Sequence, residues 1–172
     1  MQATVPLERN NGVTIAMAAQ RSILPAQFRS FAAAMVRVVP WLWLGIAVGI
    51  SLIETPIRFR TPPITRDGAA MLGVAIFHAL AYVELCLLVL LMAAAILLQG
   101  KALMIAVGGL GLIVGAEHAI VVPLLAVRAK LLLEGIQPEP SSVHAWATAF
   151  EAAKMLLLGL IGWIGQRGSK EQ

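Results

Sequence analysis

Ten ionisable side chains lie within or at the ends of long apolar stretches, where a charged group is costly. They are Glu54, Arg58, His78, Glu84, Glu117, His118, Arg128, His144, Glu151 and Lys154. Carboxylates and imidazoles can bind protons, cations or metal ions, and guanidinium and ammonium groups can balance their charge. A charged side chain in hydrocarbon costs about 3 kcal/mol on insertion scales, so such residues normally face a bundle interior or a water-filled cavity. We therefore predict that these ten residues are candidates for binding a ligand.

The stretches that carry these residues are apolar enough to span a bilayer. Of the 172 residues, 59% are hydrophobic and only 13% are charged, and the mean hydropathy is +0.85. A small soluble domain has too little interior to hide such runs. We expect four spans, at about 35–55, 69–98, 102–127 and 142–165. Because short connections make sequential helices antiparallel neighbours, the predicted fold is an all-α, integral membrane four-helix bundle with up-down-up-down topology.

The segments at the ends of the spans complete this organisation. Residues 1–30 are expected to form a mobile polar tail, 31–167 the transmembrane domain, and 168–172 a short C-terminal tail. Trp41 and Trp43 fit the aromatic belt at a membrane boundary. Pro56 is expected to break the first helix, because a proline inside a helix removes a hydrogen bond.

The ionisable groups are placed asymmetrically in depth. We call the side of the bundle that bears the first and third loops the loop side. His78, Glu117 and Glu151 each lie about nine or ten residues from that side, a depth of roughly 14–16 Å at the helical rise. Glu84 lies deeper, and Glu54 would cap the layer from the first helix. The other half of the bundle is almost purely apolar, so the pattern predicts a polar pocket that opens toward the loop side.

Spacing along the helices predicts three ion pairs: Glu151 with Lys154, Glu117 with Arg128, and Glu54 with Arg58. The last pair requires the helix to continue past Pro56. One alternative to a ligand site is that these pairs only fix the packing of the helices. A further proline, Pro123, is expected to kink the third helix beside His118.

A bound metal or haem is the sharpest alternative, since histidine and glutamate are ligand types. However, adjacent Glu117 and His118 should point about 100° apart, and the sequence has no Glu-x-x-His step, no His-x-x-x-His pair and no cysteine pair. Ser51 and Cys86 lack a nearby base in sequence and lie in no nucleophile-elbow motif. The sequence therefore assigns no cofactor and favours a non-enzymatic role.

The positive charge of the chain follows membrane topology. The net charge is +4, but the basic residues lie at span ends and in loops, with no run of five or more. We therefore predict the lipid bilayer as a partner, and no nucleic acid. A small excess of basic residues on the side of the termini favours both termini in the cytoplasm.

Gly111 and Gly115 form a GxxxG step, which suits internal packing or, as an alternative, a homo-oligomer or a larger membrane complex.

Motifs in four segments resemble those of a group of small, uncharacterised four-span bacterial integral membrane proteins. They are Thr55-Pro56-Ile57-Arg58-Phe59, Phe77 with Glu84, Pro123-x-Leu125-x-x-Arg128, and His144 with Glu151-x-x-Lys154, so the resemblance covers roughly 54–154. Arg58 stands where that group has lysine, and Val74 where it has arginine, which removes a partner for a buried acid. The resemblance implies the four-span architecture and these polar positions, but no activity.

Three functional hypotheses follow. The first is a pocket within the membrane that binds or transports a small polar or amphiphilic ligand or an ion, with Glu84, Glu117 and Glu151 binding cations or protons. The second is an accessory subunit whose polar layer only specifies packing. The third is a membrane protein that binds a metal or haem through histidine.

Overall fold

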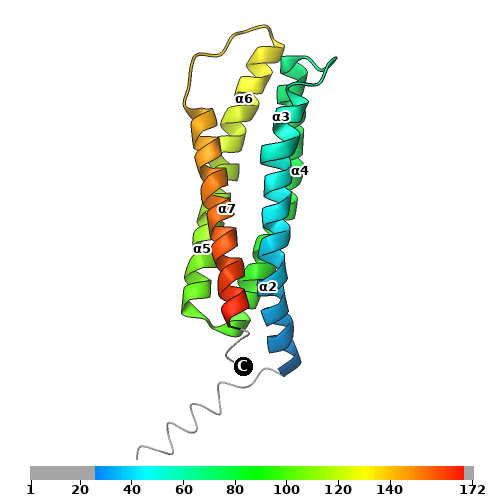
Figure 1. The fold of residues 1–172 in the computed structure, drawn as a ribbon. Coiled ribbons are helices and arrows are strands. Elements are labelled where there is room, and N and C mark those ends of the chain that lie inside the picture. The colour runs from blue at the N-terminus through cyan, green and yellow to red at the C-terminus, as the bar shows by residue number, and fades with distance from the viewer. Residues whose placement is uncertain (1–25, 169–172) are drawn as a thin grey trace, which may run out of the picture.

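A computed structural model describes residues 26–168, which form four long helices joined by short connections (Figure 1). The first helix consists of α2 (Ala26–Val48), the π-helix η1 (Gly49–Glu54) and α3 (Thr55–Arg58), and the second is α4 (Arg66–Leu98). The third consists of α5 (Lys101–Ala116), the π-helix η2 (Glu117–Val121) and α6 (Val122–Leu133), and the fourth is α7 (Val143–Arg167). Each of the four is long and apolar enough to cross a membrane. The predicted all-α, membrane-spanning four-helix bundle is therefore confirmed, and the protein is a multi-pass membrane protein.

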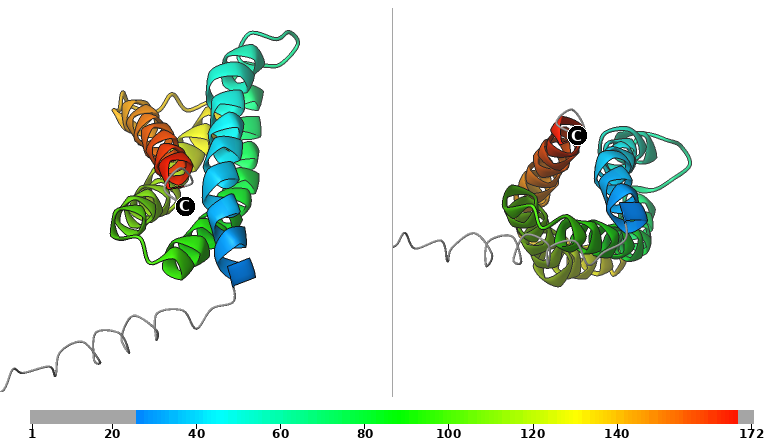
Figure 2. Two further views of the ribbon diagram at one scale, coloured as in Figure 1. Left: turned by 60° about the horizontal axis from the view of Figure 1, so that its bottom comes forward. Right: turned by 90° about the horizontal axis from the view of Figure 1, so that it is seen from below.

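The helices alternate in direction around a common axis. The first helix packs against the second and the fourth, and the third packs against the second and the fourth as well, so the four form a closed ring (Figures 1 and 2). The start of α2 and the end of α7 lie at one end of the bundle, which we call the tail side, and the first and third loops lie at the other. The predicted 1–30 tail falls mostly outside the described residues, although 26–30 already belong to α2.

The predicted break at Pro56 is wrong, because the first helix continues to Arg58. The backbone widens into a π-helix just before the proline, where the amide of Thr55 donates to the carbonyl oxygen of Ile50. This wider turn makes room for a proline ring that would collide with a regular helix. The third helix has the same arrangement, since the π-helix η2 immediately precedes the turn that contains Pro123.

Local signals explain where the other helices begin and end. The hydroxyl oxygen of Thr65 accepts a hydrogen bond from the amide of Gly68, 3.1 Å away, and so caps the start of α4. At the other end of α4, Gln99 adopts a left-handed conformation with φ of 53°, and α5 begins after a single extended residue, Gly100. Ser142 occupies the N-cap position of α7, but its side chain makes no capping bond.

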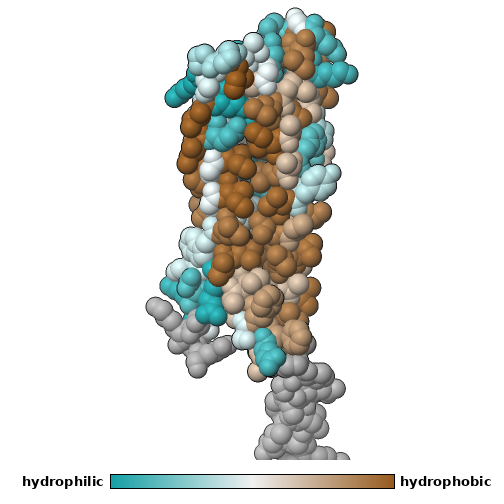
Figure 3. Space-filling model, turned by 90° about the vertical axis from the view of Figure 1, so that its right-hand side faces the viewer, coloured by the Kyte–Doolittle hydropathy of each residue, from teal (hydrophilic) through white to brown (hydrophobic). Residues whose placement is uncertain are grey.

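The tail-side half of the bundle is a dry apolar core. Trp43, Leu91, Leu110, Leu158 and Ile161 are all fully buried in it. The outer surface is also apolar, with a hydrophobic belt between two more polar ends (Figure 3). Such an exterior requires lipid as its solvent.

Glycine lets the first and fourth helices approach closely in this half. A Cβ atom at Gly165 would lie 2.8 Å from the carbonyl oxygen of Val36, and one at Gly162 would lie 2.7 Å from the ring of Trp41. These two glycines therefore serve internal packing. By contrast, a Cβ atom at Gly108, Gly115 or Gly159 would meet no neighbouring atom within 4 Å.

Candidate functional site

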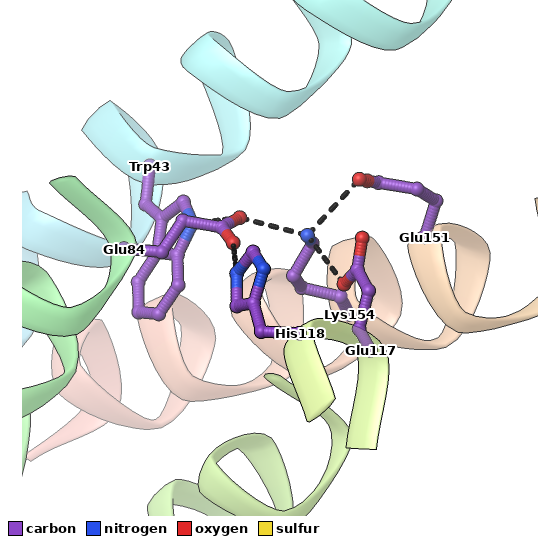
Figure 4. Close-up of polar contacts among 6 residues, drawn as sticks. All are labelled: Trp43, Glu84, Glu117, His118, Glu151 and Lys154. Atoms are coloured by element: carbon purple, nitrogen blue, oxygen red, sulfur yellow. Dashed lines mark hydrogen bonds and ion pairs between the residues drawn. The ribbon is translucent and has the colours of Figure 1, made fainter. Parts of the chain in front are cut away.

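The ammonium group of Lys154 lies at the centre of a buried charged network (Figure 4). Its Nζ donates hydrogen bonds to Oε1 of Glu84 at 2.7 Å, to Oε2 of Glu117 at 2.8 Å and to Oε1 of Glu151 at 3.0 Å. The lysine side chain and that of Glu84 are fully buried. Three carboxylates from three helices thus use all three donors of one ammonium group.

Glu84 is also held by two partners of its own. Nε2 of His118 lies 2.7 Å from its Oε2, and the indole Nε1 of Trp43 donates to its Oε1 at 3.1 Å. Trp43 comes from the first helix and His118 from the third. All four helices therefore contribute to one network, and the network fixes their rotation relative to one another.

The π-helix η2 supplies two adjacent members of the network. Glu117 contacts Lys154 on α7, whereas His118 contacts Glu84 on α4. The expected angle of about 100° between neighbouring side chains counts against a single metal ion bound by both residues. In the structure the two side chains point to different neighbours, so one turn of η2 contacts both α7 and α4.

The charges of the network do not balance if every acid is ionised. Three carboxylates face one ammonium group and one imidazole, so negative groups outnumber positive ones even with a protonated histidine. Uncompensated charge is expensive in a low-dielectric interior. The network is therefore suited to hold shared protons. The three carboxylates form no vacant site for a further cation, because the ammonium group of Lys154 already lies between them.

A pocket of about 490 Å³ lies on the loop side of this network. Its lining is mostly apolar and includes Leu52, Phe77, Leu125 and Met155, and Glu151 belongs to both the pocket and the network. The polar residues in the lining are Ser51, Thr55, Arg58, Arg66, Arg128, Gln137, His144, Thr148 and Glu151. The sequence predicted a polar pocket on this side, whereas the pocket found there is mostly apolar, and of His78, Glu84, Glu117 and Glu151 only Glu151 lines it.

Several polar atoms of the pocket lining have no hydrogen-bond partner. Among the described residues, five buried side-chain atoms lack one: Ser51 Oγ, Arg58 Nε, Arg58 Nη1, Glu151 Oε2 and His118 Nδ1. The first four belong to residues that line the pocket. Buried polar groups normally have hydrogen-bond partners, so four atoms without one on residues that line a single pocket are unusual.

Arg58 is the most deeply placed guanidinium of the lining, with only 6% of its surface exposed. Its Nη1 lies 3.2 Å from Oε1 of Glu54, one turn earlier. Its other face lies against Gly73, where a Cβ atom would come within 2.8 Å of Nη2. The predicted Glu54–Arg58 pair is formed because the helix continues through Pro56.

The ten candidate residues fall into three groups. Glu84, Glu117, His118, Glu151 and Lys154 form the network; Arg58, Arg128 and His144 join Glu151 in the pocket lining, with Glu54 supporting Arg58; and His78 belongs to neither. The last is exposed on the outer face of α4 and, within the described part of the chain, takes part in no hydrogen bond or ion pair. Six residues of helix turn His78 about 120° away from Glu84, so only one of the two can face the interior.

The predicted pair of Glu117 with Arg128 is not formed. Glu117 binds Lys154 instead, and Nη2 of Arg128 donates to the backbone carbonyl oxygen of Glu139 at 2.8 Å. The arginine thereby ties the end of α6 to the third loop.

Sequence reasoning missed several members of the site, among them Trp43 and Arg66. Trp43 was assigned to the aromatic belt, but it is fully buried and binds Glu84. A signal was present, because Trp41 and Trp43 are two residues apart and point to nearly opposite sides of a helix. Arg66 lies outside the predicted span 69–98, but α4 begins at this residue, which lines the pocket from the first turn.

Metal ligation receives no support from geometry in the described residues. No three His, Cys, Asp or Glu side chains in residues 26–168 are grouped so that they could hold a metal ion. Elemental analysis and an absorption scan of the purified protein test metal and haem binding directly.

Comparisons of this chain with protein-family models, with curated proteins and with solved structures give no match. The resemblance to small four-span membrane proteins therefore stays a resemblance of motifs, and the four-span architecture is the part of it that the fold supports.

Proposed function

We propose that this protein binds a small amphiphilic molecule in the pocket on the loop side of its charged network. The observation that carries the proposal is a single pocket lined by Ser51, Arg58 and Glu151, each of which has a buried side-chain atom without a hydrogen-bond partner. An unsatisfied buried polar group costs about 1–3 kcal/mol. A ligand that supplied the missing hydrogen bonds would offset that cost.

The dimensions and walls of the pocket support the same proposal. A volume of about 490 Å³ lies within the usual range for small-molecule sites, which are mostly apolar with a few polar groups. Leu52, Phe77, Leu125 and Met155 provide apolar wall, and the polar groups come from the ends of the helices. A molecule with both a polar and an apolar part would match this division.

The network gives the pocket a way to respond to its ligand. Glu151 lines the pocket and binds Lys154 through Oε1, and its Oε2 is buried without a hydrogen-bond partner. A ligand that contacted this carboxyl group would therefore shift charge or protons in the network beneath. Such coupling is the element that transport would need in addition to binding.

Filling the pocket tests the proposal even while the ligand is unidentified. Ala147 lines the pocket, whereas Ala145, two residues earlier on α7, is exposed and does not. Native mass spectrometry of protein purified from membranes should reveal a copurifying small molecule on the wild type and on Ala145→Phe, but not on Ala147→Phe. Equal occupancy of the two variants, or none on any protein, would contradict the proposed function.

A structural role as a subunit of a larger complex is the second candidate. It is favoured by the closure of the network, in which Lys154 and Glu84 find all their partners inside one chain. Buried polar groups of this kind can specify how helices pack. In that case Ala147→Phe would leave the protein's activity in cells unchanged, and a partner would copurify with it.

A further inference from the structure

We infer that the ligand of this pocket carries an anionic phosphate or carboxylate group, which Arg58 binds, and an apolar tail that lies against the walls. This inference rests on the proposed ligand-binding function and names the class of molecule that would be bound.

Arg58 is built to receive an anion. It is 6% exposed, lines the pocket, and has two buried nitrogen atoms, Nε and Nη1, without a hydrogen-bond acceptor. The contact of Nη1 with Glu54 at 3.2 Å supplies charge without a hydrogen bond. A guanidinium group presents its donors in a fixed planar fork that matches the oxygens of a phosphate or a carboxylate. An anion in the pocket would therefore be a second partner of Arg58 beside Glu54, one whose oxygens could accept the hydrogen bonds that the guanidinium group does not make in the structure.

The local backbone holds this guanidinium in place. A Cβ atom at Gly73 would collide with its nitrogen atoms, so the absence of a side chain there leaves room for the group to lie against α4. The ring of Phe59 lies 5.3 Å from its central carbon, within the range of a cation–π contact. An arginine positioned in advance loses little side-chain freedom when it binds an anion.

The charge of the lining favours an anion as well. Three guanidinium groups line the pocket, on Arg58, Arg66 and Arg128, against the single carboxylate of Glu151. The guanidinium groups still outnumber the acids when Glu54, the neighbour of Arg58, is counted with Glu151. This excess of positive charge would attract an anion and repel a cation.

The position of the charges within the pocket orients the ligand. Arg58 ends the first helix and Arg66 begins the second, so both lie at the loop-side end of their helices. Phe77 and Met155 line the pocket farther along their helices, toward the middle of the bundle. The anionic group would therefore lie near the membrane surface, with the tail directed inward, as in an amphiphile resident in one leaflet.

Binding by the full-length protein in a non-ionic detergent tests the class of ligand. The probes are decyl phosphate, decyltrimethylammonium and inorganic phosphate, with affinity measured by the shift of thermal unfolding against probe concentration. Decyl phosphate should stabilise the wild type, whereas decyltrimethylammonium should not. Inorganic phosphate, which has the head group alone, should bind more weakly than decyl phosphate. Nanodiscs of phosphatidylglycerol, compared with phosphatidylcholine, distinguish a membrane lipid from a free single-chain amphiphile, since only a resident anionic lipid would protect the pocket from decyl phosphate.

Matched variants connect the binding to Arg58. Arg58→Gln should weaken decyl phosphate by at least about tenfold, a change of ~1.4 kcal/mol, and Arg58→Lys should fall between it and the wild type. Arg60→Gln removes the same charge from an exposed residue, two positions after Arg58, that does not line the pocket, so it should bind as the wild type does. If Arg58→Gln does not fold, the ligand class is still tested by comparing the binding of decyl phosphate and decyltrimethylammonium to the wild type and to Arg58→Lys.

The ligand class and the proposed function fail in different ways. If decyltrimethylammonium binds as well as decyl phosphate and Ala147→Phe abolishes both, the anionic class is wrong and the pocket is still a binding site. Unchanged affinity of Arg58→Gln for decyl phosphate overturns the role of Arg58. If no probe binds and no small molecule copurifies, both the ligand class and the proposed function fail.

Discussion

Nζ of Lys154 lies 2.7 Å from Oε1 of Glu84, although the two residues are 70 positions apart in the chain. Both side chains are fully buried, so neither can exchange its partner for water. The contact therefore fixes the depth of the fourth helix relative to the second. Because Trp43 and His118 also bind Glu84, the first and third helices are tied to the same point.

The central lysine should consequently be among the most important residues for stability. Lys154→Met leaves three buried carboxylates without their cation, and breaking a buried pair in this way costs about 3–5 kcal/mol of the free energy of unfolding. Denaturation in mixed micelles, followed by circular dichroism, measures the change. Lys130→Met is the control, because Lys130 is largely exposed and its Nζ lies as far as 4.0 Å from Oε1 of Glu134. Exposed ion pairs of this kind contribute about 0–1 kcal/mol. Equal effects of the two substitutions would show that the network does not hold the bundle together.

Trp43 should stabilise the bundle through its indole N–H as well as its ring. Trp43→Phe removes the donor to Glu84, and a hydrogen bond to a charged group is worth about 1.5–3 kcal/mol. Trp146→Phe, at an exposed position near the start of α7, should change the free energy of unfolding by less than about 0.5 kcal/mol. The same denaturation measurement compares them. A similar loss for both would mean that the contact with Glu84 contributes nothing.

Periodicity and composition were sufficient for the architecture and for part of the site. Four apolar runs predicted four spans, because only a helix satisfies its own backbone in lipid. The spacing of Glu151 and Lys154 predicted a pair on one face, and that pair is formed at 3.0 Å. The depth of the ionisable residues predicted a pocket on the loop side, although of the residues placed in that layer only Glu151 lines it. These features depend on local sequence, which spacing along one helix describes well.

The rest depended on how each helix is rotated, which spacing along one helix does not determine. Depth placed His78 in one polar layer with Glu117 and Glu151, yet His78 is exposed on the outer face, whereas the deeper Glu84 faces the interior. Proline in a helix suggested a break, whereas a π-helix before Pro56 lets the first helix continue to Arg58. Widening of the helix depends on packing against its neighbours, so residue preferences alone do not reveal it.

Close contact between the first and fourth helices gives a test of the packing. A Cβ atom at Gly165 would lie 2.8 Å from the carbonyl oxygen of Val36, which is backbone and cannot rotate away. Gly165→Ala should therefore lower the free energy of unfolding by about 1–3 kcal/mol, the usual cost of overpacking. Gly159→Ala, on the same helix with no atom within 4 Å of the new methyl group, should be neutral or slightly stabilising because alanine favours helix. The opposite order of stabilities would contradict the contact between α2 and α7.

Glu151 should separate the effects of the pocket from those of the network, because it belongs to both. Glu151→Gln removes the only carboxylate of the pocket lining and offers an amide N–H in its place. If the ligand is an anion, this change should raise the affinity for decyl phosphate by at least about threefold, or ~0.7 kcal/mol. Glu134→Gln, at an exposed residue outside the pocket, supplies the control for a general change of charge. Weaker binding of decyl phosphate to Glu151→Gln, with its unfolding temperature intact, would instead mean that the carboxylate itself recognises the ligand. The polar part of that ligand would then be a donor or a cation, and Arg58 would have to be assigned a structural role.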